Sequence, residues 1–135
     1  MKQKHRKVAF VGSTAMPVTT GICTAIVDLL RELPPRAVVL TRGNAPIERF
    51  IANACTVLDI PCFTYPARGF SDNWNRDVDL ARDADEVIAL IASDTLPAVN
   101  TGTAHLIEKA IDLKRPVRAF SEVGDRLVYA GATDD

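Results

Sequence analysis

The feature that most restricts the fold is a regular alternation of short apolar runs with longer amphipathic segments. The short runs are rich in β-branched residues and are expected to be strands: 7–11, 37–41, 61–65, 86–92 and 117–120, with 127–130 as a sixth at an edge. The longer segments repeat apolar residues at helical spacing, over 19–33, 46–58, 75–84 and 103–114. Strands that alternate with helices of about 10 to 15 residues build βαβ units around a parallel sheet. The pattern predicts an α/β fold, with helices on both faces of a mostly parallel sheet of five or six strands.

The chain length fits one domain that spans residues 1–135 and has a single core. The basic start, residues 1–6, is expected to be a tail, and no apolar segment of the signal-peptide type follows it. Residues 131–135 are expected to fray.

Charge and cysteine content exclude several classes of function. The net charge of −1 gives no support to a long nucleic-acid footprint, which needs a strong positive excess. The apolar runs are far shorter than the roughly 18 residues that span a membrane. Cys23, Cys55 and Cys62 are odd in number and lack CxxC spacing, so they are expected to be reduced thiols in a cytoplasmic protein. No cluster of ligands predicts a metal site, and no cofactor is expected.

The strongest candidate for ligand binding is Gly102-Thr103, between an apolar strand and an amphipathic helix. A helix N-terminus presents backbone N–H groups and the positive end of the helix dipole, which favour an anion such as phosphate. Ligands of parallel sheets bind beyond the carboxyl ends of the strands, where the strand order reverses. We therefore expect the loops at those ends, Thr101 included, to converge on one phosphate site.

Two other loops are expected at the same edge. Gly12, Ser13 and Thr14 follow the first strand, and they either donate to a phosphate or form a tight turn. They match neither a Walker A loop nor a GxGxxG fingerprint.

After the second strand, Arg42-Gly43-Asn44 combines a guanidinium with a glycine turn. Arg42 either forks to an anion or is solvated. Glu48, one turn into the next helix, either accepts from a ribose hydroxyl or complements the helix dipole.

A cationic and aromatic group comprises Arg68, Trp74 and Arg76. The arginines are expected to add positive charge to the site, while Trp74 either stacks on a base or covers the core. His105 lies in the first turn of the Gly102-Thr103 helix, where a neutral imidazole is favoured. It is a candidate ligand contact or general base.

Taken together, these residues resemble the SLOG superfamily, Rossmann-like domains that include DNA-processing protein A and the Lonely Guy phosphoribohydrolases. The resemblance covers about residues 8–120 and is closest to the small stand-alone branch. Its elements are the G-S turn at 12–14, the segment 42–48 in place of G-G-A-x-G-x-D, Arg76-Asp77 followed by Ala84-Asp85, and Gly102-Thr103 followed by Ala110 and Arg115-Pro116-Val117. It implies a Rossmann-like three-layer sandwich, a nucleotide or nucleotide-derived ligand, and a homodimer.

The chain departs from the hydrolase branch at the catalytic position. Leu106 stands where that branch has its catalytic glutamate, and Thr14 replaces the arginine of the first motif. Either Glu48 or His105 has taken over proton transfer, or the domain binds without hydrolysing. The expected function is nucleotide binding with the phosphate at Gly102-Thr103. The alternatives are an enzyme that cleaves an N-glycosidic bond, such as a nucleoside 5′-monophosphate phosphoribohydrolase, and a partner- or single-stranded-DNA-binding domain.

Overall fold

The computed structural model describes residues 6–43, 45–65, 72–92 and 102–133. The strands are β1 (Arg6–Gly12), β2 (Ala37–Thr41), β3 (Cys62–Thr64), β4 (Glu86–Ala92), β5 (Val117–Val123) and β6 (Arg126–Thr133). The helices are α1 (Thr20–Arg31), α2 (Pro46–Leu58), α3 (Asp72–Asp83) and α4 (Gly102–Asp112). The predicted α/β class and the mostly parallel sheet are confirmed, as is the Rossmann-like arrangement.

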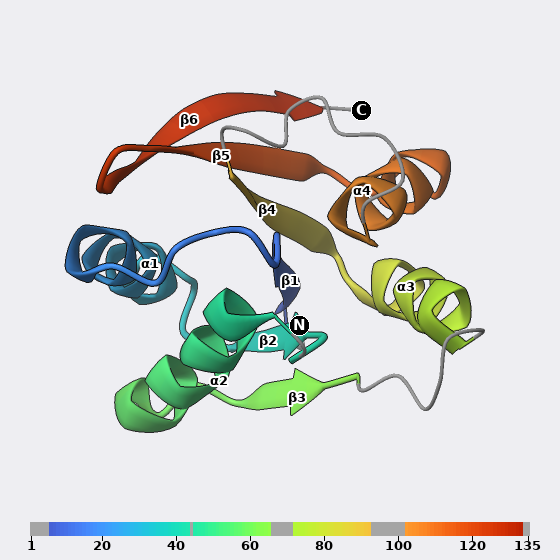
Figure 1. Ribbon diagram of the computed structural model, residues 1–135. Coiled ribbons are helices and arrows are strands. Elements are labelled where there is room, and N and C mark those ends of the chain that lie inside the picture. Colours follow the sequence, from blue (N-terminus) through green and yellow to red (C-terminus); the bar gives the residue numbers. More distant parts are fainter. Residues whose placement is uncertain (1–5, 44, 66–71, 93–101, 134–135) are drawn as a thin grey trace.

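One six-stranded sheet has the order β3-β2-β1-β4-β5-β6 (Figure 1). Every neighbouring pair is parallel except β5 and β6, which form an antiparallel hairpin. The order reverses at β1, which pairs with β2 on one side and with β4 on the other. The carboxyl ends of β1 and β4 therefore flank the position where ligands of such sheets bind.

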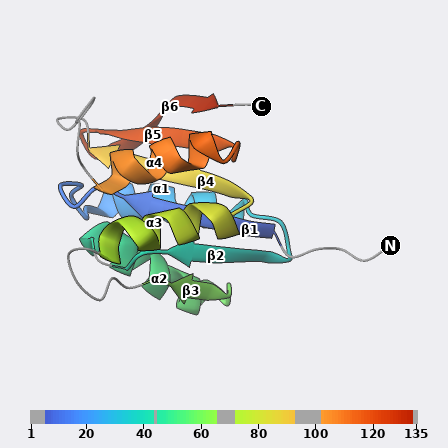
Figure 2. The ribbon, with the colours of Figure 1, turned by 90° about the vertical axis from the view of Figure 1, so that its right-hand side faces the viewer.

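The helices cover both faces of the sheet, and each face has its own apolar core. α1 and α2 pack on one face through residues such as Ile22, Ile26 and Ile51. α3 and α4 pack on the other face through Leu80 and Leu106, and Figure 2 shows them side by side in front of the sheet. The expected single core is thus two apolar layers separated by the sheet.

Local sequence explains where α1 and α2 begin and end. The Thr19 hydroxyl accepts a hydrogen bond from Ile22 N at 3.3 Å and so caps α1. Pro34-Pro35 follows soon after α1 ends. Pro46 occupies the first turn of α2, where its missing N–H costs nothing.

Several boundaries differ from the expected ones. Arg6, assigned to the tail, begins β1 and pairs with Ala37. β5 and β6 extend beyond the expected 117–120 and 127–130, because the two strands pair along their whole length through a hairpin. Residues 131–133 therefore belong to β6 and are not part of a frayed end.

Candidate functional site

A buried ionic network lies at the carboxyl edge of the sheet, where β2 ends. Arg42 is 4% exposed and Glu48, in the first turn of α2, is fully buried. Glu48 Oε2 lies 2.7 Å from Arg42 Nε, 2.6 Å from Arg42 Nη2 and 3.1 Å from Gly12 N, while Ala45 N donates to Oε1 at 3.3 Å. Both carboxylate oxygens are occupied by the protein itself. This geometry favours a structural role for Glu48 over the proposed catalytic one.

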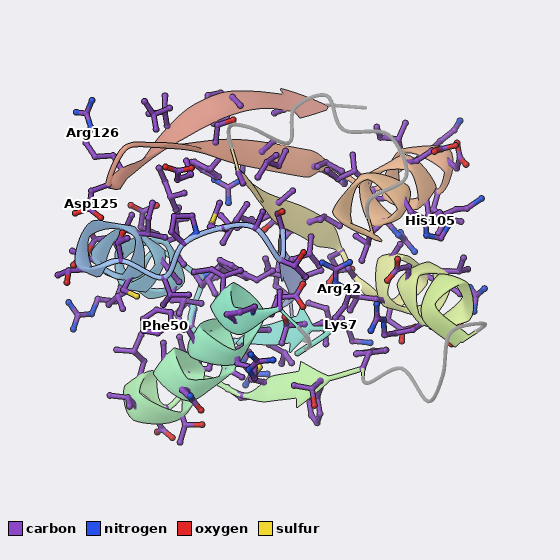
Figure 3. All side chains as sticks on the ribbon, in the orientation of Figure 1. Lys7, Arg42, Phe50, His105, Asp125 and Arg126 are labelled. Atoms are coloured by element: carbon purple, nitrogen blue, oxygen red, sulfur yellow. The ribbon has the colours of Figure 1, made fainter. Side chains whose placement is uncertain are left out.

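The network continues across the end of the sheet to the opposite face. Arg42 Nη2 donates to Gly12 O at 3.0 Å, and Arg42 Nη1 lies 3.9 Å from Asp77 Oδ1 on α3. Asp77 also lies 3.4 Å from Arg76 Nε and 3.1 Å, through Oδ2, from His105 Nδ1 on α4. Asp77 therefore links α3 and α4 to Arg42, which follows the carboxyl end of β2. Figure 3 shows Arg42 between α2 and α3, and His105 beside α4.

The contact with Asp77 fixes the orientation of the His105 ring. A carboxylate between two guanidinium groups only accepts hydrogen bonds, so Nδ1 of His105 must carry the proton. The other ring nitrogen, Nε2, is the acceptor of the ring in its neutral form. A buried aspartate that orients a histidine in this way is the arrangement by which proteins position a general base.

Arg76 has unsatisfied hydrogen-bonding capacity. It is 6% exposed, and its Nη1 has no hydrogen-bond partner among the residues that the structure describes. A buried guanidinium nitrogen without a partner costs about 1–3 kcal/mol, so such a group usually faces a ligand, an ion or water. Through Asp77, Arg76 is held next to His105 in the first turn of α4.

The loop after β1 contains the tight turn that was one of its two predicted roles. Gly12 is buried, and a Cβ there would collide with Ile47 of α2. Ser13 N donates to Leu90 O at 3.0 Å, and the Ser13 hydroxyl accepts from Ala15 N at 3.2 Å. Thr14 is exposed. Gly12 thus ends β1, and Ser13 begins a tight turn in which Met16 N donates to Ser13 O at 3.1 Å.

The N-terminus of α1 is already occupied by an anion from the same chain. The Asp125 carboxylate, at the turn between β5 and β6, accepts from Gly21 N at 3.1 and 3.2 Å and from the Thr19 hydroxyl. The sequence pattern missed this contact. The Gly-Asp pair between two strand-like runs predicts a hairpin turn, but only the topology brings that turn to α1.

Of the remaining predicted site residues, some are described by the structure and some are not. Gly43 has a φ of +77°, which explains a glycine at this turn. Gly102 and Thr103 are the first residues of α4, as expected of an anion-binding helix start. Asn44, Arg68 and Thr101, and the side chain of Trp74, lie outside the described residues.

Tyr65, which follows β3, is not a candidate base. Its hydroxyl donates to Asp83 Oδ2 at 2.7 Å. Burial first, and then this hydrogen bond and the charge of Asp83, raise the pKa of the phenol well above its ordinary value. Tyr65 therefore stays protonated at neutral pH.

Within the described ranges, no three histidine, cysteine or acidic side chains are grouped so as to hold a metal ion. Nor does any helix there have the length and apolar character to cross a membrane. Comparison with models of known protein families, with curated proteins and with solved structures finds no match to this chain.

Proposed function

We propose that the protein binds a nucleotide or nucleotide-derived ligand at the carboxyl edge of the sheet, with a phosphate between Arg76 and the N-terminus of α4. The observation that carries the proposal is the buried Arg76 guanidinium, whose Nη1 has no partner among the described residues. A phosphate oxygen accepts from such a nitrogen with a charge-assisted hydrogen bond. The N-terminus of α4 adds N–H donors on the same side.

Arg42, the second buried arginine that the structure describes in this network, is paired within the protein. It donates through Nε to Glu48 and through Nη2 to Gly12 O, and its Nη1 lies beside Asp77. We therefore assign Arg42 to holding the framework of the site and Arg76 to the ligand. The α1 N-terminus already receives Asp125, which favours α4 as the phosphate-binding helix.

A thermal-shift panel tests this function. AMP, ADP, NAD, ADP-ribose and cyclic nucleotides are compared with adenosine and with a single-stranded oligonucleotide. At a hundredfold excess over Kd, a ligand of the native state adds about 2.7 kcal/mol of stability. We expect at least one phosphorylated compound to stabilise the protein and adenosine not to. Equal stabilisation by adenosine, or stabilisation by the oligonucleotide alone, contradicts a nucleotide phosphate site.

A second candidate function is cleavage of an N-glycosidic bond, favoured by the His105–Asp77 pair. In this reaction His105 would transfer the proton, and Asp77 would position it. Chromatography of AMP incubated with the protein tests it: free adenine is expected from the wild type and not from His105→Gln. Binding of AMP without release of adenine contradicts this enzymatic function and is compatible with binding only.

The SLOG resemblance supports the same assignment, and membership of that superfamily is part of the proposal. The homodimer that the resemblance implies is a separate prediction, tested by measuring the molecular mass in solution. The cytoplasmic location also stays a prediction, based on three free cysteines.

A further inference from the structure

The β5–β6 hairpin, at one edge of the sheet, carries an aromatic pair that stays open to water (Figure 1). Phe120 of β5 and Tyr129 of β6 are partners in the strand register, and their rings meet edge to face with centroids 5.6 Å apart. Tyr129 is nevertheless 57% exposed. Tyrosine is enriched at protein interfaces, because its ring buries a large apolar area while its hydroxyl can remain hydrated. The pair is therefore a candidate centre for a protein contact.

Two charges of opposite sign flank this pair on the same face of β5. Successive side chains of a strand alternate between its faces, so Arg118, Phe120 and Glu122 share one face. Their register partners on β4 all belong to the apolar core beneath α1 and α2, which fixes the face. Arg118 and Glu122 are both partly exposed, and no ion pair or hydrogen bond joins either side chain to another residue that the structure describes.

The two charges do not neutralise each other. Four residues of extended chain separate them by about 13 Å, which exceeds the reach of an ion pair. Arg126 does not compensate Glu122 on this face, because it lies opposite Val123 in the register and so belongs to the other face of the hairpin. Asp125, at the turn, is engaged with the N-terminus of α1.

The order of the groups along β5 is self-complementary. From Arg118 to Glu122 the face reads positive, aromatic, negative. A second copy that is turned by a two-fold axis through the aromatic pair runs antiparallel to the first. It therefore places its negative end on Arg118 and its positive end on Glu122, and the aromatic rings meet at the centre. A parallel arrangement would bring like charges together. Closed dimers use this geometry, in which the same patch of both subunits meets across the axis.

We propose that this surface, the hairpin face formed by Arg118, Phe120, Glu122 and Tyr129, is the contact between two copies of the chain. The aromatic centre supplies buried apolar area, and the two flanking ion pairs fix the antiparallel orientation. The inference does not rest on the nucleotide site, because none of these residues belongs to the network around Arg42, Asp77 and His105.

Sedimentation equilibrium of the full chain at rising concentration tests the proposal first. We expect a species of twice the mass of one chain, and we expect its dissociation constant to increase between about 50 mM and 500 mM salt, because partly exposed ion pairs are screened. A protein that stays monomeric at concentrations up to about 1 mM overturns the proposal.

Charge reversals then identify the contact surface. Arg118→Glu and Glu122→Arg should each raise the dissociation constant at least about tenfold, because the two-fold axis repeats every like-charge contact. The first variant has a doubly negative hairpin face and the second a doubly positive one. Mixed together, they should form a dimer of one copy of each, detected by native mass spectrometry.

Arg126→Glu, on the opposite face of the same hairpin, is the matched control and should dimerise as the wild type does. Formation of the mixed dimer also shows that both variants are folded. A dimer that withstands both single reversals lies on another surface and overturns the proposal. So does the failure of two folded single variants, checked by circular dichroism, to associate with each other.

Discussion

At the scale of single residues, Glu48 shows how a charged side chain is used inside this protein. It is fully buried, and its oxygens accept from Arg42, Gly12 N and Ala45 N. We expect Glu48→Gln to remove the closest counter-charge of the buried Arg42 guanidinium and to lower the free energy of unfolding by about 3–5 kcal/mol. Urea denaturation measures this, with the exposed Glu108→Gln as control. A loss equal to that of the control would show that the pair contributes little.

Gly12 provides a second prediction, which concerns its close packing against Ile47. A methyl group there would collide with Ile47, so Gly12→Ala should cost about 1–3 kcal/mol of stability. Adding Ile47→Ala removes the obstructing atoms. Chemical denaturation of the double variant should show that the two costs are not additive. Simple additivity would mean that the glycine serves something other than close packing.

Tyr65 provides a prediction about pH. Because burial and Asp83 raise the pKa of the phenol in the fold, its contribution to stability is fully present below the unfolded-state pKa of about 10 and is lost as the pH rises above it. The difference in ultraviolet absorbance between the wild type and Tyr65→Phe should report ionisation of Tyr65 above pH 10. Ionisation of Tyr65 at or below its ordinary pKa would contradict the hydrogen bond to Asp83.

At the scale of elements, the β5–β6 hairpin is fastened to α1 by one carboxylate. Asp125 accepts from Gly21 N and from the Thr19 hydroxyl. It lies so close to Gly21 that a side chain at position 21 would collide with it. Asp125→Ala should therefore cost about 0.5–2 kcal/mol, the usual loss for a helix cap, measured by thermal or urea unfolding. The exposed Asp112→Ala is the control. Equal effects of the two changes would show that the hairpin turn does not cap α1.

At the scale of the whole molecule, the alternation of apolar runs and amphipathic segments was enough to predict the elements and the parallel sheet. The capping role of Thr19 also follows from local sequence, because the cap lies three residues from its partner. Long-range contacts do not follow. Asp77 meets His105 and Arg42 only because α3 and α4 pack together beside the reversal of strand order. Asp125 reaches α1 only through the β5–β6 hairpin.

The candidate site was predictable only in part, for the same reason. Parallel topology places Arg42, Arg76 and His105 at one edge, as expected. The sequence pattern alone does not distinguish a guanidinium that is neutralised by a buried glutamate from one that has a nitrogen to spare. That distinction depends on side-chain contacts: Arg42 pairs with Glu48, whereas Arg76 Nη1 has no hydrogen-bond partner among the described residues.

The most direct measurement is the affinity of Arg76→Gln for the best phosphorylated ligand of the panel, determined by calorimetry beside the wild type. The exposed Arg82→Gln, on the same helix, is the matched control. We predict a loss of about 10- to 100-fold for Arg76→Gln, since a hydrogen bond to a charged group contributes about 1.5–3 kcal/mol, and no change for Arg82→Gln. A folded Arg76→Gln protein that binds as tightly as the wild type would contradict the account.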